Sequence, residues 1–329
     1  MFLSAQFGCF RAGSSPGALY TYVNETMRIL IAYDGSEGAE AALDDLTRAG
    51  LPREAEALIM VTDVWMVASQ GDFTRAVARR RQLSAETSSF APALRSLEEE
   101  RALTREATRR LRAAFPSWDV GAEGARGAGA VAPALLRRAA AWGADLVVVG
   151  SQRPSAQNLS DGGATRRVAA EAPCSVRVAR PAAAAPRRAL RILVGGDGPS
   201  ESGGALRAVA ARAWPQESEC HVVAVSPPGA AVVETLKAAG LTVSTAARGG
   251  DGRRALIEEA SAWGADCIFV GANAREAGDD LNAPDCLITS LVAGSPCSVE
   301  VARSPMGAAA GAFLSLARAP LLATAAGAF

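Results

Sequence analysis

Aspartate, glycine and hydroxyl side chains follow the apolar runs of the first half, where they could hold a phosphate-bearing ligand. Asp34, Gly35 and Ser36 come directly after the run at 28–33, and Gly150 ends a later run. Glycines let backbone N–H groups approach a phosphate closely, and a hydroxyl adds a further donor. Such residues are suited to binding a ligand, and the chain has no convincing catalytic base for hydrolysis.

The motifs of common hydrolases and dinucleotide enzymes are incomplete. Glu201 stands where the glycine-rich fingerprint beginning at Gly196 needs its third glycine, and no Walker A sequence occurs. The serine motif at 13–17 has no strand before it, and the only histidine, His221, lies in an apolar run of the other half. We therefore expect no catalytic residue and no metal site, and we do not expect an enzyme.

Three sequence blocks occur twice in the same order. The matched pairs are 27–35 with 190–198, 141–150 with 262–271, and 172–180 with 295–303. Repetition of ordered blocks predicts two copies of one domain.

Each copy alternates apolar runs typical of buried strands with helical patterns. Ser36 is a candidate N-cap for a helix whose apolar face includes Leu43 and Leu46. Unbroken apolar runs such as 146–149 and 268–270 require helices on both faces of the sheet. The pattern predicts an α/β fold of two doubly wound parallel sheets, with any ligand at the carboxyl ends of the strands. The polar residues and glycines at these ends are Asp34, Asp197, Gly150 and Gly271.

The patterned elements divide the chain into five parts. We expect an N-terminal extension at 1–26, domains at 27–180 and 190–303, a linker at 181–189 and an apolar tail at 304–329. The extension lacks a signal-peptide pattern, and we expect it to be disordered. The tail is long enough to span a bilayer, but its alanines, glycines and charge make a loose tail the preferred interpretation.

The first domain also carries an insertion at 66–115, which predicts a helix over 94–111. Its polar face indicates a solvated helix, and a lid or docking surface is the alternative.

Charge and cysteine content limit the partners. The chain has 34 Lys and Arg against 34 Asp and Glu, so no net field attracts nucleic acid or an acidic membrane. The six cysteines show no zinc-ligand spacing. Cys174 and Cys297 occupy equivalent places in the repeats, where we expect buried core residues. A reduced, cytoplasmic protein is expected.

The repeated blocks, in their order, resemble the universal stress protein family in its tandem form. The resemblance implies a five-stranded parallel domain of the adenine nucleotide α hydrolase-like class. It also implies pairing through the last strand and, in some members, binding of ATP.

The ATP-binding members carry Gly-x-x-Gly, nine further residues, then Gly-Ser or Gly-Thr. In the first domain Gly150 matches the first glycine, Arg153 replaces the second, and Gly163 begins the last pair, with Gly162 and Thr165 alongside. The loop is partly preserved, and Arg153 either obstructs it or supplies a compensating positive charge.

In the second domain the same loop is degenerate. Gly271 matches, but Asp285 and Cys286 stand where the last pair is expected. The family's acidic residue after the first strand corresponds to Asp34 and Asp197, and the alternative for each is that it caps the turn.

The last strands of the two domains are expected to pair antiparallel. Their central residues are Val176, Arg177 and Val178 in the first domain and Val299, Glu300 and Val301 in the second. Arg177 would lie close to Glu300, an attraction of about 0.2 to 1 kcal/mol, whereas identical copies would oppose like charges. The tandem chain should therefore pair with itself, while a further homodimer and an unidentified protein partner stay open.

These observations favour a binding or regulatory module with at most one weak site for ATP and Mg²⁺, in the first domain. The rival is a nucleotide-free scaffold in which both sites have lapsed, and an adenine-nucleotide hydrolase ranks third.

Overall fold

A computed structural model describes most of the patterned part of the chain. The described residues are 26–62, 91–125, 131–151, 162–181, 189–196, 199–224, 230–247, 252–272 and 287–303. The N-terminal extension, most of the linker and the apolar tail lie outside them, so the predictions made for these segments stay predictions.

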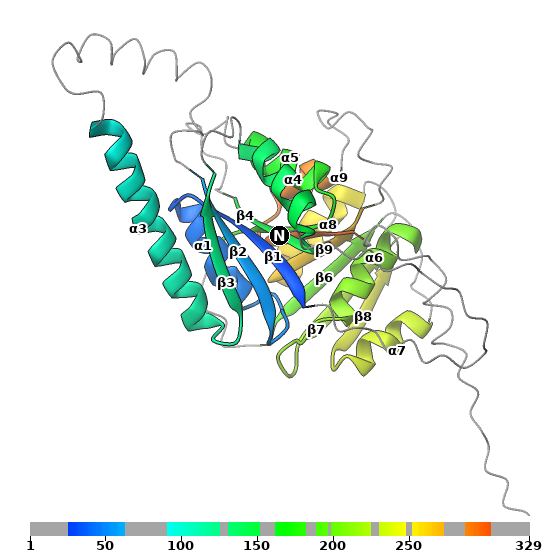
Figure 1. The fold of residues 1–329 in the computed structure, drawn as a ribbon. Helices are drawn as coiled ribbons and strands as arrows, with labels where there is room; N and C mark the ends of the chain where they lie inside the picture. The colour runs from blue at the N-terminus through cyan, green and yellow to red at the C-terminus, as the bar shows by residue number, and fades with distance from the viewer. Residues whose placement is uncertain are drawn as a thin grey trace, which may run out of the picture.

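The strands of both halves form a single ten-stranded sheet (Figure 1). Its order is β3-β2-β1-β4-β5-β10-β9-β6-β7-β8. Neighbouring strands run parallel except β5 and β10, which run antiparallel at the junction of the halves. The predicted α/β fold class is confirmed: each half contributes five parallel strands in the doubly wound order, and the two sets join edge to edge. The strand bounds are β1 Met27–Tyr33, β2 Ala55–Val61, β3 Asp119–Gly124, β4 Leu146–Gly150, β5 Ser175–Ala179, β6 Arg191–Gly196, β7 Glu219–Ala224, β8 Thr242–Ala247, β9 Cys267–Gly271 and β10 Ser298–Ala302.

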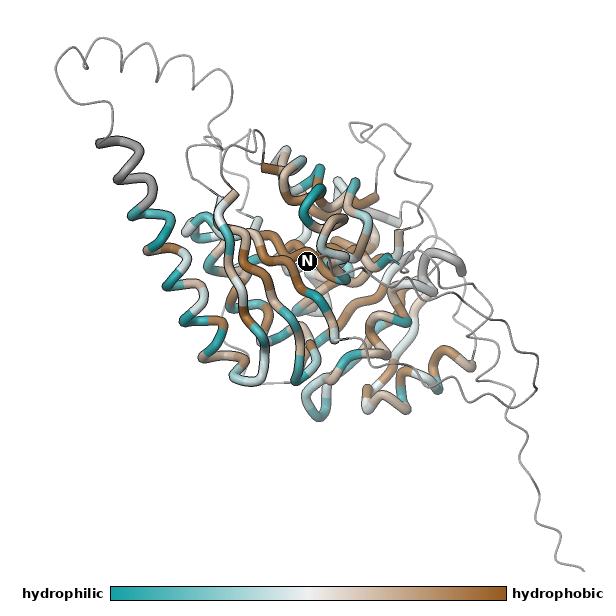
Figure 2. Tube along the Cα trace, viewed as in Figure 1, coloured by the Kyte–Doolittle hydropathy of each residue, from teal (hydrophilic) through white to brown (hydrophobic). Residues whose placement is uncertain are grey.

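Helices cover both faces of this sheet. On one face lie α1 (Glu37–Leu46) and α3 (Ala91–Ala114) in the first half, and α6 (Pro199–Ala210) and α7 (Ala230–Ala238) in the second. The other face carries α4 (Val131–Trp142) and α5 (Gly162–Glu171), followed by α8 (Gly252–Trp263) and α9 (Leu287–Gly294). The central strands between these layers are strongly hydrophobic (Figure 2).

Local sequence signals account for the helix ends. Ser36 has extended backbone angles, and its hydroxyl accepts the N–H of Ala39 at 3.2 Å, so it is the N-cap of α1 as predicted. Gly143 and Gly264 follow α4 and α8 with φ of +67° and +68°, the left-handed conformation that ends a helix.

Helix α3 contains the predicted helix of the insertion, and one face of its second half is buried. Ala107 and Leu111 are buried in the core of the first half. Arg110 forms ion pairs with Glu40 and Asp44 of α1, at 2.6 Å in the second case. This part of α3 is therefore a layer of the fold.

At the β5–β10 junction the two faces of the sheet carry different kinds of side chain. Below α5 and α9, Val176 and Val178 join Val299 and Val301 in one apolar core that includes residues of both halves. On the face of α1 and α6 the two halves have separate apolar cores, and the residues between them are charged. The junction is thus apolar on one side and ionic on the other.

The ionic side is a chain of four buried charges. Arg177 lies opposite Glu300 in the strand register, and its Nη1 lies 3.1 Å from Glu300 Oε2. Its Nε also lies 2.5 Å from Asp45 Oδ2 on α1, and Glu300 is shared with Arg212 at the end of α6. The exposed side-chain fractions of Asp45, Arg177, Glu300 and Arg212 are 4, 1, 0 and 7%.

This arrangement corrects the expectation of an isolated cross-strand pair. Burial lowers the pKa of Arg177, but Asp45, Cys267 and Glu300 together raise it by more, so the net shift of the pKa is upward. Burial lowers the pKa of Arg212, against the attraction of Glu300. The four charges sum to zero, and each carboxylate lies against at least one guanidinium, which is the condition under which buried charges are tolerated.

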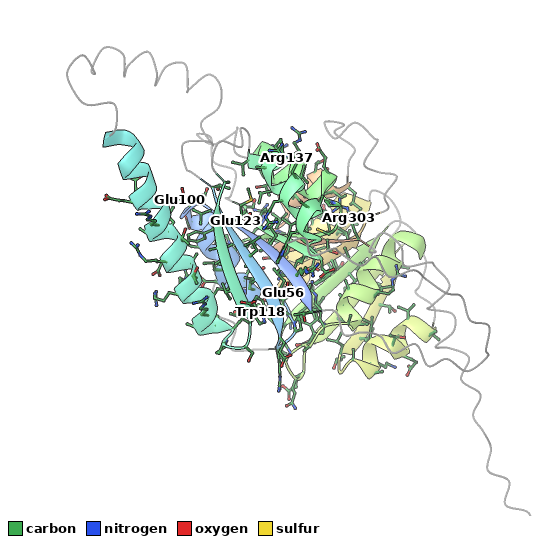
Figure 3. All side chains as sticks on the ribbon, in the orientation of Figure 1. Glu56, Glu100, Trp118, Glu123, Arg137 and Arg303 are labelled. Atoms are coloured by element: carbon green, nitrogen blue, oxygen red, sulfur yellow. The ribbon has the colours of Figure 1, made fainter. Side chains whose placement is uncertain are left out.

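Two further arginines connect the halves reciprocally. Arg180, directly after β5, donates from Nη2 to Val292 O at 2.6 Å, at the end of α9. Arg303, directly after β10, donates from Nη2 to Ala169 O at 2.6 Å, near the end of α5, and it is labelled in Figure 3. A cation at a helix C-terminus satisfies carbonyls that have no intrahelical donor and opposes the helix dipole.

Removal of one member of the ionic junction should be strongly destabilising. We expect Arg177→Met to lower the free energy of unfolding by about 3 to 5 kcal/mol, because Asp45 and Glu300 lose a buried counter-charge. Urea unfolding measures this. Arg109→Met is the control, since that side chain is 68% exposed and its pairing with Glu106 is a surface ion pair. A loss below about 1 kcal/mol for Arg177→Met would contradict the ionic junction.

Exchange of the central pair should not restore stability. The double variant Arg177→Glu with Glu300→Arg would place the new carboxylate against Asp45 and the new guanidinium against Arg212. We expect it to unfold at a lower urea concentration than Arg177→Met, because like charges are then buried together. Recovery to the parent midpoint would mean that Asp45 and Arg212 take no part.

Candidate functional site

The candidate site lies where β1 and β4 end. These strands are neighbours, and the chain winds away from them in opposite directions, toward β2 and toward β5. Ile31 pairs with Val148, so β4 ends at Gly150 level with Tyr33. Ligands of doubly wound sheets bind at such a switch point. The structure therefore brings the turn at Asp34 and the loop after Gly150 together.

The turn after β1 is held by its own side chains. Asp34 Oδ1 accepts the N–H of Ser36 at 2.9 Å, which is the capping role considered for this aspartate. Gly35 has φ of +74°, and a Cβ there would lie 2.5 Å from Leu103 Cδ2 of α3. Helix α3 therefore packs directly on the turn, and glycine is required at 35.

Gly150 also has a structural reason to be glycine. A Cβ at this position would lie 2.1 Å from the carbonyl oxygen of Gly38, in the first turn of α1. The close approach of α1 to β4 thus needs Gly150 whether or not a phosphate binds.

The first turn of α5 is the part of the site that remains open. Gly163 is exposed, and no atom lies within 4 Å of the place where its Cβ would be. Thr165 donates its hydroxyl proton to Gly150 O at 3.3 Å, which holds the helix against the end of β4. This turn contains no acidic residue, and the first N–H groups of a helix lack intrahelical partners. N–H groups of this kind are where an anion contacts a helix, and the acidic neighbour in the sequence, Asp161, lies outside the described residues.

Several predicted site residues lie outside the described residues. They are Arg153 in the first half and Asp197, Asp285 and Cys286 in the second. The counterpart Gly271 ends β9 and is buried. The proposed degeneracy of the second loop stays a prediction.

Two of the four buried charges at the β5–β10 junction were not predicted from the sequence. Asp45 was missed, although it follows Ala41 and Ala42 at helical spacing on the buried face of α1. Arg212 carried no such signal, because it lies beyond the last turn of α6.

The cysteines of the described residues are core residues, as expected from the repeats. Cys174 and Cys297 are each 9% exposed, and Cys220 and Cys267 are more deeply buried. Burial raises the pKa of Cys174 and of Cys297 to about 11, and that of Cys220 to about 12. Thiols of this kind are poor nucleophiles near neutral pH.

Comparison with known proteins identifies the first half. Residues 25–180 match the model of the Universal stress protein family. Residues 25–180 are therefore a domain of the universal stress protein family. No curated protein matches the chain.

Solved structures extend the likeness over both halves. A universal stress protein from Archaeoglobus fulgidus has a TM-score of 0.58 at 17% identity, over 85% of this chain and 99% of its own. A functionally unknown protein from Pseudomonas aeruginosa has a TM-score of 0.47 at 14% identity, over 86% and 94%. Universal stress protein UspA from Lactobacillus plantarum gives 0.32 at 22% identity, over 47% and 97%. The first of these shows that the whole ten-stranded arrangement is a known fold.

Among the described residues, no helix is both long enough and apolar enough to cross a bilayer.

The buried thiols predict a loss of stability at high pH. The pKa of Cys297 is raised from 9.0 to about 11 on folding, so this thiol favours the folded state fully below pH 9 and loses that contribution between pH 9 and 11. One such group changes the free energy of unfolding by about 1.4 kcal/mol per pH unit in that window. We expect Cys297→Ala to reduce the pH slope of urea unfolding by about that amount, whereas an unchanged slope would show that the thiol ionises normally in the fold.

Proposed function

We propose that the first half binds an adenine nucleotide weakly and that the chain acts as a binding or regulatory module. The observation that carries this proposal is the first turn of α5. It lies at the switch point of the sheet, it is open at Gly163, and it contains no acidic residue. The universal stress protein fold supplies the expectation that the anion is the phosphate chain of ATP.

The residues present suit phosphates better than they suit a bare metal ion. The N–H groups at Gly163 to Thr165 would hold phosphate oxygens, helped by the dipole of α5. Among the described residues, no group of three or more His, Cys, Asp or Glu side chains could hold a metal. Mg²⁺ would therefore be bound through the nucleotide, and the described protein groups would serve mainly to position its phosphates.

A nucleotide-free scaffold is the second candidate, and specific contacts favour it. Gly150 is explained by the packing of α1, and Asp34 by the N–H of Ser36. Leu103 packs on Gly35 at the same end of the sheet. Under this hypothesis the joined halves form a rigid scaffold whose surface binds a partner.

The second half is proposed not to bind nucleotide, because Asp285 would bring a carboxylate toward phosphate. Two like charges about 4 Å apart repel by roughly 1 kcal/mol in water and 4 kcal/mol at an effective dielectric near 20. We also propose a cytoplasmic location, since the buried cysteines are unpaired.

Calorimetric titration of the full chain with ATP and Mg²⁺ tests the proposal. We expect at most one site per chain. Gly163→Asp should weaken binding by about 5- to 1,000-fold, since the new carboxylate would lie against phosphate. An acidic residue in the first turn favours the helix itself, so a loss of binding would not reflect loss of α5.

Gly163→Ala is the matched control, because open space surrounds the position and a methyl group adds no charge. It should bind ATP nearly as the parent does. Two equal sites per chain would contradict the asymmetry of the halves. No heat at millimolar ATP would favour the scaffold, and release of ADP would favour the hydrolase.

A further inference from the structure

The single histidine of the chain lies between a serine and a glutamate. His221 on β7 has its Nδ1 2.7 Å from Ser244 Oγ on β8. Its Nε2 lies 3.4 Å from Glu259 Oε1 on α8. His221 lies in the other half from the serine motif at 13–17, but the strand register places Ser244 directly opposite it.

The first half has no equivalent of this cluster. In the matched registers Leu58 occupies the place of His221, and Gly121 that of Ser244. Counting back from Trp142 and Trp263 puts Arg138 in the place of Glu259. The same scaffold is therefore stable without these polar groups, so the fold does not require the triple.

One tautomer of the imidazole suits the role of a base toward Ser244. A proton on Nε2 faces the Glu259 carboxylate and leaves the lone pair of Nδ1 toward the serine hydroxyl. At 3.4 Å the contact between Nε2 and Glu259 is not a hydrogen bond in the structure, and Nε2 has no hydrogen-bond partner among the described residues. Catalytic contacts of this kind often tighten only when a substrate binds. Trp263 lies against the ring, with centroids 5.3 Å apart, and limits its rotation.

Nucleophilic catalysis needs an accessible nucleophile and a screened base, and the exposures of the three side chains follow this order. Ser244 is exposed, whereas the side chains of His221 and Glu259 are 12% and 17% exposed. The nucleophile would thus meet solvent, while its base and the orienting acid are screened.

We propose that Ser244, His221 and Glu259 form a nucleophilic triad that accepts the acyl group of a small ester. Ser244 Oγ would bond to the ester carbonyl carbon while His221 Nδ1 takes the hydroxyl proton. The bond to the alcohol oxygen then breaks, and that oxygen leaves with the proton from His221. Water attacks the acyl-serine with the same base, which returns the serine and releases a carboxylic acid.

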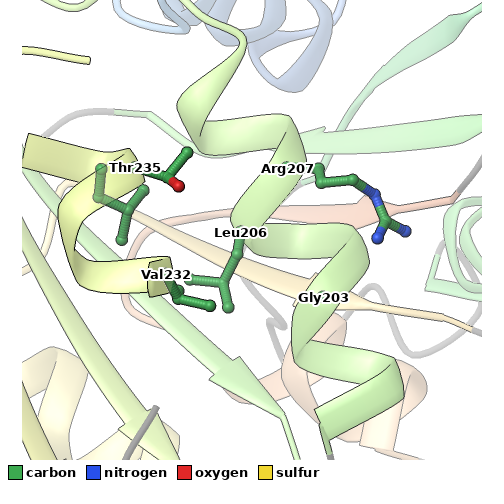
Figure 4. A pocket seen from close by; sticks show the side chains of 6 residues that line it. Gly203, Leu206, Arg207, Val232 and Thr235 are labelled. Carbon is green, nitrogen blue, oxygen red and sulfur yellow. The ribbon is translucent and has the colours of Figure 1, made fainter. Parts of the chain in front are cut away.

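The surroundings restrict the substrate to a small one at the edge of the sheet. β8 is the last strand of the sheet, and within the described residues no strand pairs with its outer side. Alternate backbone N–H groups there are available to a carbonyl oxygen. The apolar groove between α6 and α7, lined by Leu206, Val232 and Leu236 among others (Figure 4), lies on the opposite face and cannot receive the acyl chain.

A fluorophosphonate probe of reactive serines tests the triad in the full-length protein. We expect a covalent adduct on Ser244, located by fragmentation of the tryptic peptide 238–248. His221→Leu, which installs the residue of the first half, should slow labelling by about 100-fold or more. Thr242→Val is the matched control, since it lies on the same face of β8 two residues away, and it should label as the parent does.

Glu259→Gln keeps the shape of the cluster and should also slow labelling, which separates its role from folding. Thermal unfolding checks that each variant is folded. Hydrolysis of p-nitrophenyl acetate gives a second readout, and Ser244→Ala should abolish the acyl-enzyme burst. No adduct on Ser244, an adduct formed equally fast without His221, or a burst that survives Ser244→Ala would each overturn the proposal. Nucleotide binding in the first half is not involved in any of these outcomes.

Discussion

The structure depends on the antiparallel contact between β5 and β10. All other strand pairings are parallel and lie within one half, so this contact alone makes one sheet from two. Its residues face two environments. Valines of both strands enter a shared apolar core, and Arg177 and Glu300 enter a buried chain of charges that extends to Asp45 and Arg212. The apolar side buries hydrophobic surface area. The ionic side selects the partner strand, because a second copy of β5 in place of β10 would bury two arginines against each other.

The halves share a scaffold and several polar residues, such as Arg180 and Arg303, but they differ in the polar groups of the two proposed sites. The first half has an open helix start at Gly163. The second half has the cluster around His221, which lies on its two outermost strands, β7 and β8. A paired tandem chain can change one copy while the other keeps the core intact. The proposed nucleotide site and the proposed triad both lie where the two halves differ in sequence.

Much of the fold could be predicted from the sequence, because repeated apolar runs and their flanking glycines report local structure. Ser36, Gly143 and Gly264 act as expected at helix ends. The edge strands β3 and β8 were not named in advance, since their small and polar residues lack a buried-strand pattern. The candidate site was located by strand ends alone, but the packing of Gly38 on Gly150 and of Leu103 on Gly35 involves residues distant in sequence. For the same reason the roles of Asp45 and of the partners of His221 could not be predicted, because one sequence does not show which distant side chains come into contact.

The most direct test of this account is native-state hydrogen exchange of the backbone amides of β5 and β10. If their pairing unites the halves, the amides at 176–178 and 299–301 that bond across the junction should exchange only with global unfolding, together with the central strands β1 and β6. Exchange of these amides well before that of β1 and β6, at the rate of an exposed edge strand, would show that the halves separate while each stays folded. The account of a single sheet held by an ionic and an apolar face would then be contradicted.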